Sequence, residues 1–405
     1  MNLAERHIVK SNDKLFKSFD REAFLSKNLH NTTTYELRQA FFDKDKKMPS
    51  YKDLAGLFAA SNNPDFRALP AKVSQWTMKR VFQSFKDFFA ASKEYKKNPN
   101  RFTGKPKLPN YKHKTKGRAL LTYTIQAISK TKLRQGIIKL SGCDIEFKTK
   151  CIPSSIKQVR IVPEYGHYAI EVIYEKQEKP KKKLHPQKIA SIDIGLNNLG
   201  ALTFSHQQAP ILINGRPLKS INQYFNKKKA KLMSFIGGKG TSRKIKKLTL
   251  KRNNKAKDYL HKASRYIVNQ LVSKGTTLLV IGKNDSWKQD INIGKKNNQS
   301  FVSIPHAIFI KMLSYKCSLE GINIKLQEES YTSKCSFLDL ESIKKHLIYK
   351  GRRIERGMFK SKKYGTINAD INGSLNIMRK AVPKLFSNGI EDVVVRPYSK
   401  VKTFL

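Results

Sequence analysis

An aspartate inside an apolar, strand-like run constrains this chain more than any other feature of its sequence. The run Ile189-Ala-Ser-Ile-Asp-Ile has the character of a buried strand, yet Asp193 places a charge within it. Burying a carboxylate is costly unless a metal ion or a charged partner compensates for it. Gly195 allows a sharp turn after the acid and Gly200 opens the next strand, which predicts a hairpin that a ligand can approach closely. A turn or cap residue is the alternative interpretation of Asp193.

A second aspartate, Asp370, lies far along the chain at the start of a helix-like pattern whose apolar face is Ile371, Leu375 and Met378. Capping the helix is the ordinary role of an aspartate in this position. The two acids can nevertheless converge if the first strand is central in an α/β sheet and the last helix packs across it. Carboxylate oxygens are preferred ligands of Mg²⁺, and a pair of such ions can hydrolyse a phosphodiester. Convergence of Asp193 and Asp370 is therefore our hypothesis.

This chemistry usually needs a third acid, and Glu328 and Glu329 are the candidates, at the end of a strand-like run. Neighbouring residues of a strand point to opposite faces, so only one of the two can face the site. Regular alternation predicts Glu328 on the core face with Ile324 and Leu326, and Glu329 on the other face. Irregularity at a strand end can reverse this, so the residues alone leave the choice open.

The charge of the chain predicts a polyanionic partner. Lys and Arg number 81 against 30 Asp and Glu, and a net charge of +51 disfavours compaction unless a polyanion screens it. We expect that polyanion to be nucleic acid, with a membrane surface as the weaker alternative. Between Asn226 and Lys257 there are thirteen cations and no acid, so we expect nucleic-acid contacts there, a solvated helix being the alternative. The candidate contact residues are Lys227, Lys228, Lys229, Arg243, Lys244, Lys247 and Arg252.

Other classes of protein fit the sequence poorly. No apolar run reaches the roughly 18 residues that a membrane-spanning helix needs, and the start at Met1 lacks the apolar core of a signal peptide. We therefore expect a cytoplasmic protein with no membrane partner. The cysteines lack Cys-x-x-Cys spacing, so neither a disulfide framework nor a four-thiolate zinc site is predicted. They are Cys143, Cys151, Cys317 and Cys335.

Changes of pattern along the chain predict its domains. Residues 20–96 place apolar side chains at helical spacing and predict a helical module. Residues 97–180 begin with a Pro- and Lys-rich loop and continue with strand-like runs, which predict a small barrel or sheet. The charged stretch that follows combines proline with like charges, so we place a linker at residues 181–188. Residues 189–405 alternate strand-like and helix-like segments and predict an α/β domain.

The motifs around the acids resemble those of the TnpB family. They are Asp193 in Asp-Ile-Gly-Leu-Asn-Asn-Leu, Glu329 in Glu-Ser-Tyr-Thr-Ser-Lys and Asp370 in Asn-Ala-Asp-Ile-Asn-Gly-Ser. That family comprises transposon-encoded RNA-guided nucleases, sometimes called OrfB transposases, which are similar to the compact type V CRISPR effectors. The runs that begin at Gly104, Ile281 and Gly294 add to the resemblance, which covers most of the chain.

This resemblance implies an architecture of the α/β and β classes. Residues 1–19 and 97–180 would form a wedge-type β-barrel, with residues 20–96 inserted as a helical recognition module. Residues 189–405 would form a RuvC nuclease domain, which is RNase H-like. The protein would be bacterial or archaeal and associated with the nucleoid.

The resemblance also implies an activity and partners. A guide RNA would pair with target double-stranded DNA, while the protein reads a short adjacent motif. Asp193, Glu329 and Asp370 would hold two Mg²⁺ ions, or Mn²⁺, for the hydrolysis of DNA phosphodiester bonds. The chain would then be a metal-dependent DNA endonuclease. A carboxylate-triad transposase, which joins DNA strands, would use the same ion chemistry.

One departure from the family concerns the catalytic acids. Most relatives carry an acid at the position of Gly282, so either another acid substitutes or the chain is a nuclease-dead RNA-guided DNA-binding repressor. A subgroup that resembles this sequence has moved the glutamate to the neighbouring strand. Because Glu329 directly precedes the Ser-Tyr-Thr-Ser motif, the resemblance favours Glu329 over Glu328.

The second departure concerns the zinc ribbon that many relatives build from four cysteines. The corresponding segment, near residues 334–364, retains only Cys335, with His346 nearby. One thiol and one imidazole do not make a four-ligand tetrahedral site, so we predict no structural zinc. Basic residues fill the segment instead, among them Arg352, Arg353 and Arg356, and they could contact phosphate.

Overall fold

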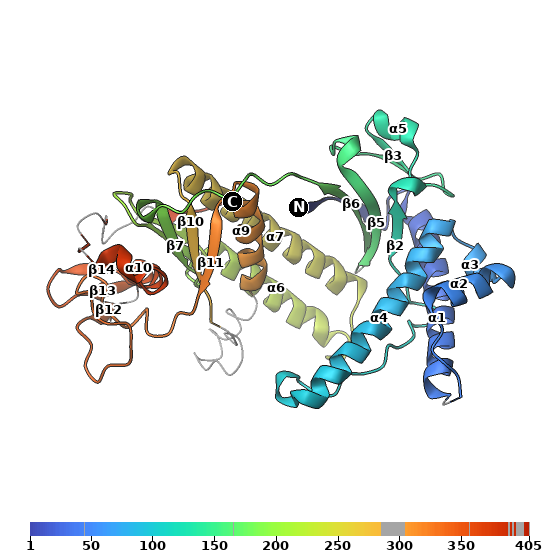
Figure 1. The fold of residues 1–405 in the computed structure, drawn as a ribbon, viewed down its shortest axis with the longest axis horizontal. Coiled ribbons are helices and arrows are strands. Elements are labelled where there is room, and N and C mark those ends of the chain that lie inside the picture. The colour runs from blue at the N-terminus through green and yellow to red at the C-terminus, as the bar shows by residue number, and fades with distance from the viewer. Residues whose placement is uncertain are drawn as a thin grey trace. The chain divides into compact units, whose positions relative to one another are not determined.

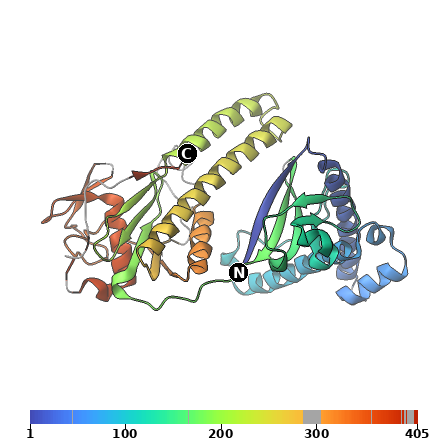
Figure 2. The same ribbon diagram turned by 90° about the horizontal axis from the view of Figure 1, so that it is seen from above.

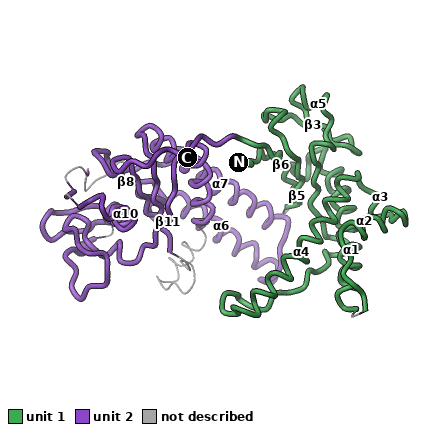
Figure 3. Tube along the Cα trace, viewed as in Figure 1, with its two compact units in different colours: residues 1–176 green, residues 177–405 purple. Residues whose placement is uncertain are grey.

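The chain divides after Lys176 into two units, residues 1–176 and 177–405 (Figure 3). This division lies close to the start of the linker that the sequence predicts. The computed structural model describes residues 1–43, 45–164, 166–284, 304–355, 357–387, 389–390, 393 and 401–404. None of the helices within these ranges is long and apolar enough to cross a membrane.

The first unit combines helices with an antiparallel sheet (Figure 1). Its strand order is β1-β6-β5-β2, so the first residues of the chain pair with its last strand before the division. These strands are β1 (Asn2–Lys10), β2 (Leu121–Thr124), β5 (Ile156–Glu164) and β6 (His167–Glu175). A separate pair consists of β3 (Ile137–Lys139) and β4 (Glu146–Lys148). Closure of these strands into the expected wedge-type barrel stays a prediction.

The helices of this unit lie mainly between β1 and β2 in the sequence. They are α1 (Phe16–Phe42), α2 (Tyr51–Ala60), α3 (Pro64–Arg67) and α4 (Ala71–Lys97), followed later by α5 (Lys130–Arg134). α1 begins four residues before the start expected for the helical module. Phe19, Leu29 and Met78 from α1 and α4 are fully buried with Tyr123 of β2, so helices and sheet share one core.

The second unit is built on a mixed sheet with the order β11-β10-β7-β8-β9-β15. β10 is parallel to β7 and β11, whereas β8 is antiparallel to β7 and β9. The strands are β7 (Ile189–Asp193), β8 (Asn198–Phe204), β9 (Ile211–Asn214), β10 (Leu278–Gly282), β11 (Asn323–Gln327) and β15 (Val401–Lys402). The helices are α6 (Arg216–Ser234), α7 (Arg243–Ser273), α9 (His306–Leu319) and α10 (Ala369–Ala381). The α/β organisation expected for residues 189–405 is confirmed.

The two faces of this sheet are covered by different helices, α7 and α9 on one side and α10 on the other (Figure 2). Ile192 and Ile281 pack with α7 and α9. At alternate positions, Ile189 and Val280 pack with α10. Asp193 has the same parity as Ile189, so it belongs to the α10 face.

The stretch expected to be a linker is held against the second unit. The Lys179 N–H donates to Leu319 O at 3.3 Å, and the Lys182 N–H donates to Gly321 O at 2.8 Å. Asn323 Nδ2 in turn donates to Lys182 O at 2.9 Å. A segment with a proline and several like charges can therefore be extended and still be bound to a domain. The residues expected to be a free linker, 181–188, are attached to the second unit through the hydrogen bonds of Lys182.

The segment expected to be a degenerate zinc ribbon is cross-linked by carboxylates. Asp339 accepts hydrogen bonds from the Ser361 hydroxyl at 2.8 Å and from the Lys362 N–H at 3.0 Å, and Glu341 accepts from the Ser336 N–H at 2.8 Å. The Cys335 thiol donates to backbone carbonyls. The segment then forms the small sheet β12 (Arg352–Glu355), β13 (Met358–Lys360) and β14 (Thr366–Asn368) before α10 begins.

Asn376 of α10 provides a test of how this helix is held. Its Nδ2 atom donates to Thr332 O at 2.9 Å and to Cys335 O at 2.8 Å, and the side chain is fully buried. Asn376→Ala leaves both carbonyls without this donor and should cost about 1–3 kcal/mol in unfolding free energy, measured by urea denaturation. Asn254→Ala, at an exposed position of α7, is the control and should cost less than about 0.5 kcal/mol. Equal losses in the two variants would contradict the assigned role.

Candidate active site

Buried hydroxyl groups hold α10 across β7 and β8. The Ser191 hydroxyl donates to Ser374 O at 2.7 Å, and the Thr203 hydroxyl hydrogen bonds with those of Ser191 and Ser374, at 2.8 Å each. Directly before Ser374, a Cβ atom on Gly373 would lie 2.6 Å from Asp193 Oδ2. The helix can therefore approach the Asp193 carboxylate only because residue 373 is glycine.

Asp193, at the end of β7, lies in an unfavourable electrostatic environment. Burial raises the pKa of Asp193 well above its usual value, and the negative charges of Glu329 and Asp370 raise it further. The positive charge of Arg353 acts in the opposite direction. The three acids that the sequence and the resemblance singled out thus lie near enough for the charges of Glu329 and Asp370 to act on Asp193.

Asp370 is the second residue of α10 and is not its cap. That role belongs to Asn368, whose Oδ1 atom accepts from the N–H groups of Asp370 at 3.0 Å and Ile371 at 3.3 Å. The Asp370 carboxylate instead accepts from Asn198 Nδ2 at 2.7 Å and lies 3.8 Å from the Arg353 guanidinium. The capping interpretation is therefore removed, and this carboxylate is available at the site.

Glu329 fills the space beside Gly282. Gly282 ends β10 with the parity that faces α10, and a Cβ atom there would overlap Glu329 Oε1 and lie 2.6 Å from Ile377 Cδ1. Burial, and secondly the charge of Glu328, raise the pKa of Glu329 to about 7. Within the described residues, Glu329 Oε1 is buried without a hydrogen-bond partner. An acid from the turn after β11 thus lies beside the end of β10, where the family resemblance led us to expect a carboxylate.

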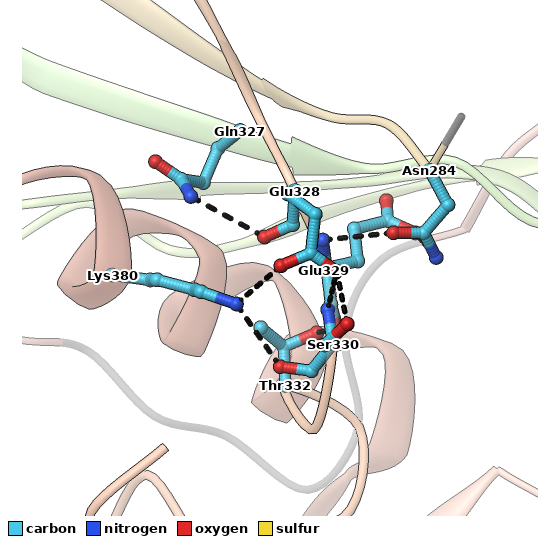
Figure 4. A network of polar contacts seen from close by, with 7 residues as sticks. All are labelled: Asn284, Gln327, Glu328, Glu329, Ser330, Thr332 and Lys380. Atoms are coloured by element: carbon cyan, nitrogen blue, oxygen red, sulfur yellow. Dashed lines mark hydrogen bonds and ion pairs between the residues drawn. The ribbon is translucent and has the colours of Figure 1, made fainter. Parts of the chain in front are cut away.

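Glu328 points toward Lys380 (Figure 4). It accepts from Lys380 Nζ at 2.6 Å and from the Ser330 N–H at 2.6 Å. The hydrogen bond from Lys380 is the main cause of the lowered pKa of Glu328, and the side chain is exposed. The alternation that predicted Glu328 on the core face is wrong because β11 ends at Gln327. Leu326, expected in the core, is already 50% exposed.

The residues expected to contact nucleic acid lie on α6 and α7, which do not carry the three acids. Lys227, Lys228 and Lys229 are exposed on α6, and Arg243, Lys244 and Lys247 are exposed on α7. Arg252 is half-buried: its Nε atom donates to Asn222 Oδ1 at 2.8 Å, and its guanidinium lies over the Phe225 ring. Arg252 thus has a structural role within the helical pair in addition to its charge.

Three residues at the site were not singled out as site residues by the sequence. Asn198 contacts Asp370, Arg353 lies near the same carboxylate, and Asn284 contacts Glu329. Asn198 and Asn284 stand within the motifs that carry the family resemblance, Asp-Ile-Gly-Leu-Asn-Asn and Ile-Gly-Lys-Asn. Their positions in those motifs were the available signal, but an uncharged amide gives no electrostatic reason for selecting it.

The three carboxylates supply oxygen atoms, which are the ligands that Mg²⁺ and Mn²⁺ prefer. Nowhere in the described ranges do three or more His, Cys, Asp or Glu side chains form a group that could hold one metal ion. The carboxylates nevertheless influence one another, and the buried Glu329 Oε1 lacks a partner. Hard oxygen ligands with uncompensated charge are typical of Mg²⁺ or Mn²⁺ sites that keep water and substrate among their ligands. Asp193, Glu329 and Asp370 are the residues that could hold such ions.

Two family models match this chain. OrfB_IS605, described as a probable transposase, matches residues 171–288, and the model of the Cas12f1-like TNB domain matches residues 306–377. A TnpB-like protein, ORF457 of Acidianus two-tailed virus, is 24% identical over 89% of this chain and 83% of its own length. These matches cover both the region of Asp193 and that of Glu329 and Asp370.

Two solved structures share the fold at low sequence identity. The Cas12f1–sgRNA–target DNA complex has a TM-score of 0.54 and 14% identity, covering 89% of this chain and 82% of that chain. The mini-RNA-guided endonuclease CRISPR-Cas_phi3 has a TM-score of 0.53 and 11% identity, covering 94% and 92%. The likeness to these structures concerns the fold, and the motifs around the acids together with the family matches support a TnpB family protein.

Proposed function

We propose that this protein is a transposon-encoded, RNA-guided DNA endonuclease that hydrolyses phosphodiester bonds with two divalent cations. The observation that carries the proposal is the carboxylate of Glu329, which stands in the space left by Gly282 and interacts with Asp193. A chain that had lost its nuclease function would have no reason to keep there an acid whose Oε1 atom is buried and, within the described residues, accepts no hydrogen bond. The same observation argues against the nuclease-dead repressor that Gly282 alone suggests.

The architecture supports this function. Asp193 ends an interior strand of a mixed sheet, and the helix that carries Asp370 crosses that strand. This arrangement is the one expected of an RNase H-like RuvC domain over residues 189–405. In the first unit, β6 pairs with β1 although the helices of residues 20–96 lie between them in the sequence. A wedge domain with an inserted recognition module requires such a pairing.

The three carboxylates would each act as a ligand of the ions. When bound, two Mg²⁺ ions activate the attacking water and stabilise the leaving oxygen. Asp193, which interacts with both other acids, would be the shared ligand. Glu329 would contribute Oε1, and Asp370 would be oriented by the hydrogen bond from Asn198. Mn²⁺ has the same preference for oxygen ligands and should substitute for Mg²⁺.

Guide RNA and target DNA would be the partners. The similar Cas12f1 structure is a complex with an sgRNA and target DNA. The excess of Lys and Arg over Asp and Glu in this chain would allow it to neutralise many nucleic-acid phosphates. The exposed lysines of α6 and the basic start of α7 present this charge on helices separate from the carboxylates. Sequence recognition would then come from base pairing, with the protein neutralising the backbones.

Glu328 and Glu329 form a matched pair for testing the active site. Glu329→Gln should lower the rate of Mg²⁺-dependent cutting at least about 100-fold, because it removes a ligand charge, with binding of RNA and DNA retained. Glu328→Gln removes only an exposed ion pair and should change the rate less than about twofold. Gel assays of cutting by the purified guide complex check this. Undiminished cutting by Glu329→Gln would contradict the site, and joined instead of cut strands would indicate a transposase.

The titration of Glu329 provides a second test, in the metal-free protein. The pKa of Glu329 is about 7 in the folded chain and near 4.5 when unperturbed, so folding favours the protonated form. This carboxyl therefore costs no stability below pH 4.5, and its cost grows as the pH rises from 4.5 to about 7. Glu329→Gln should raise the melting temperature in EDTA at about pH 8 and leave it unchanged at about pH 4. A shift of the same size at both pH values would rule out this burial.

A further inference from the structure

The amide of Asn284 contacts Glu329 at two points. Asn284 follows the end of β10 by two residues, and its Oδ1 atom accepts from the Glu329 N–H at 3.0 Å. Its Nδ2 atom donates to Glu329 Oε2 at 3.3 Å. Figure 4 shows the amide beside Glu329, with a dashed line from Asn284 Oδ1 to the backbone N–H of Glu329. A single side chain thus fixes both the position of the residue and the direction of its carboxylate.

These contacts make the two carboxylate oxygens unequal. Oε2 accepts from Asn284, whereas Oε1 lies above Gly282 and, within the described ranges, accepts no hydrogen bond. An amide can accept through its oxygen and donate through its nitrogen at once, which neither a carboxylate nor an aliphatic side chain can do. Asn284 therefore leaves one defined oxygen available at the site.

The rest of the turn is held from the other side. The N–H and the hydroxyl of Thr332 both donate to Glu329 O, at 3.1 and 2.8 Å. Lys380 holds the neighbouring Glu328 outward and also donates to Ser330 O at 3.2 Å. These bonds fix the path of the backbone but do not touch the Glu329 carboxylate. In the described part of the chain, the hydrogen bond that orients this carboxylate comes from Asn284.

We propose that Asn284 is a positioning residue that aims Glu329 Oε1 at a divalent cation shared with Asp193. The inference rests on the proposed function and adds a specific requirement to it. An acid on β10 would be oriented by the strand itself, whereas Glu329 comes from a turn beyond β11 and needs a side chain to orient it. Asn284 supplies that orientation through the amide contacts.

Binding of Mn²⁺ to the full chain, freed of nucleic acid and followed by electron paramagnetic resonance, tests the proposal without relying on cutting. Asn284→Ala should weaken Mn²⁺ binding about 10–100-fold, the usual effect of losing a group that orients a metal ligand. Asn284→Leu keeps a branched side chain but lacks donor and acceptor, and it should show the same loss. The control is Gln327→Ala, which should bind like the parent, because among the described residues its side chain donates a hydrogen bond to Glu328 O alone, at 3.4 Å.

Each other outcome overturns the proposal in a distinguishable way. Unchanged Mn²⁺ affinity in both Asn284 variants would remove the positioning role, while the comparison of Glu328→Gln with Glu329→Gln could still support the nuclease. Absence of Mn²⁺ binding by the parent beyond that of Asp193→Ala would remove the proposed metal site as well. A loss shared by Gln327→Ala, or matched by a fall in metal-free melting temperature, would show a general structural effect and contradict the specific role.

Discussion

The contact of α10 with β7 through small polar side chains is the interaction on which the rest of the site depends. Ser191, Thr203 and Ser374 add directional hydrogen bonds to the apolar contacts that join this helix to the sheet. Such bonds fix the helix along its axis as well as across the strand, and Gly373 allows the close approach. Asp370 is consequently held near Asp193, although neither acid contributes to the packing that brings them together.

The third acid reaches the end of β10 from a neighbouring segment of the chain. Gly282 removes a side chain from β10 on the α10 face, and the turn after β11 delivers Glu329 into the same space. The result is electrostatically unfavourable without a cation, because burial raises the pKa of both Asp193 and Glu329. Asn284 and Lys380 separate the adjacent glutamates, one toward the site and one toward solvent. Unfavourable charge retained in a well-ordered core is typical of a functional site.

Much of the second unit could be predicted from sequence because its strands are apolar and its helices are long. β7 and the start of α10 lie within one residue of the positions expected from the sequence. The patterns of the sequence could not predict β12 to β14, which are short and polar. The pairing of β1 depends on residues far away in the chain, and it was the family resemblance that placed residues 1–19 with residues 97–180. Alternation failed at Glu328 because it holds only while the strand continues, and β11 ends one residue earlier. The capping interpretation of Asp370 failed because Asn368 accepts those hydrogen bonds. Glu329 was favoured only through the family motif.

The central claim is that divalent cations bind where Asp193, Glu329 and Asp370 meet, and locating the metal tests it most directly. Anomalous diffraction from crystals grown with Mn²⁺ would show its position without reference to activity. The account predicts Mn²⁺ within ligand distance of Asp193 and Glu329 Oε1, with a second ion at Asp370 and with Glu328 still paired with Lys380. Mn²⁺ bound by Glu328 instead, or no Mn²⁺ beside Asp193, would contradict it.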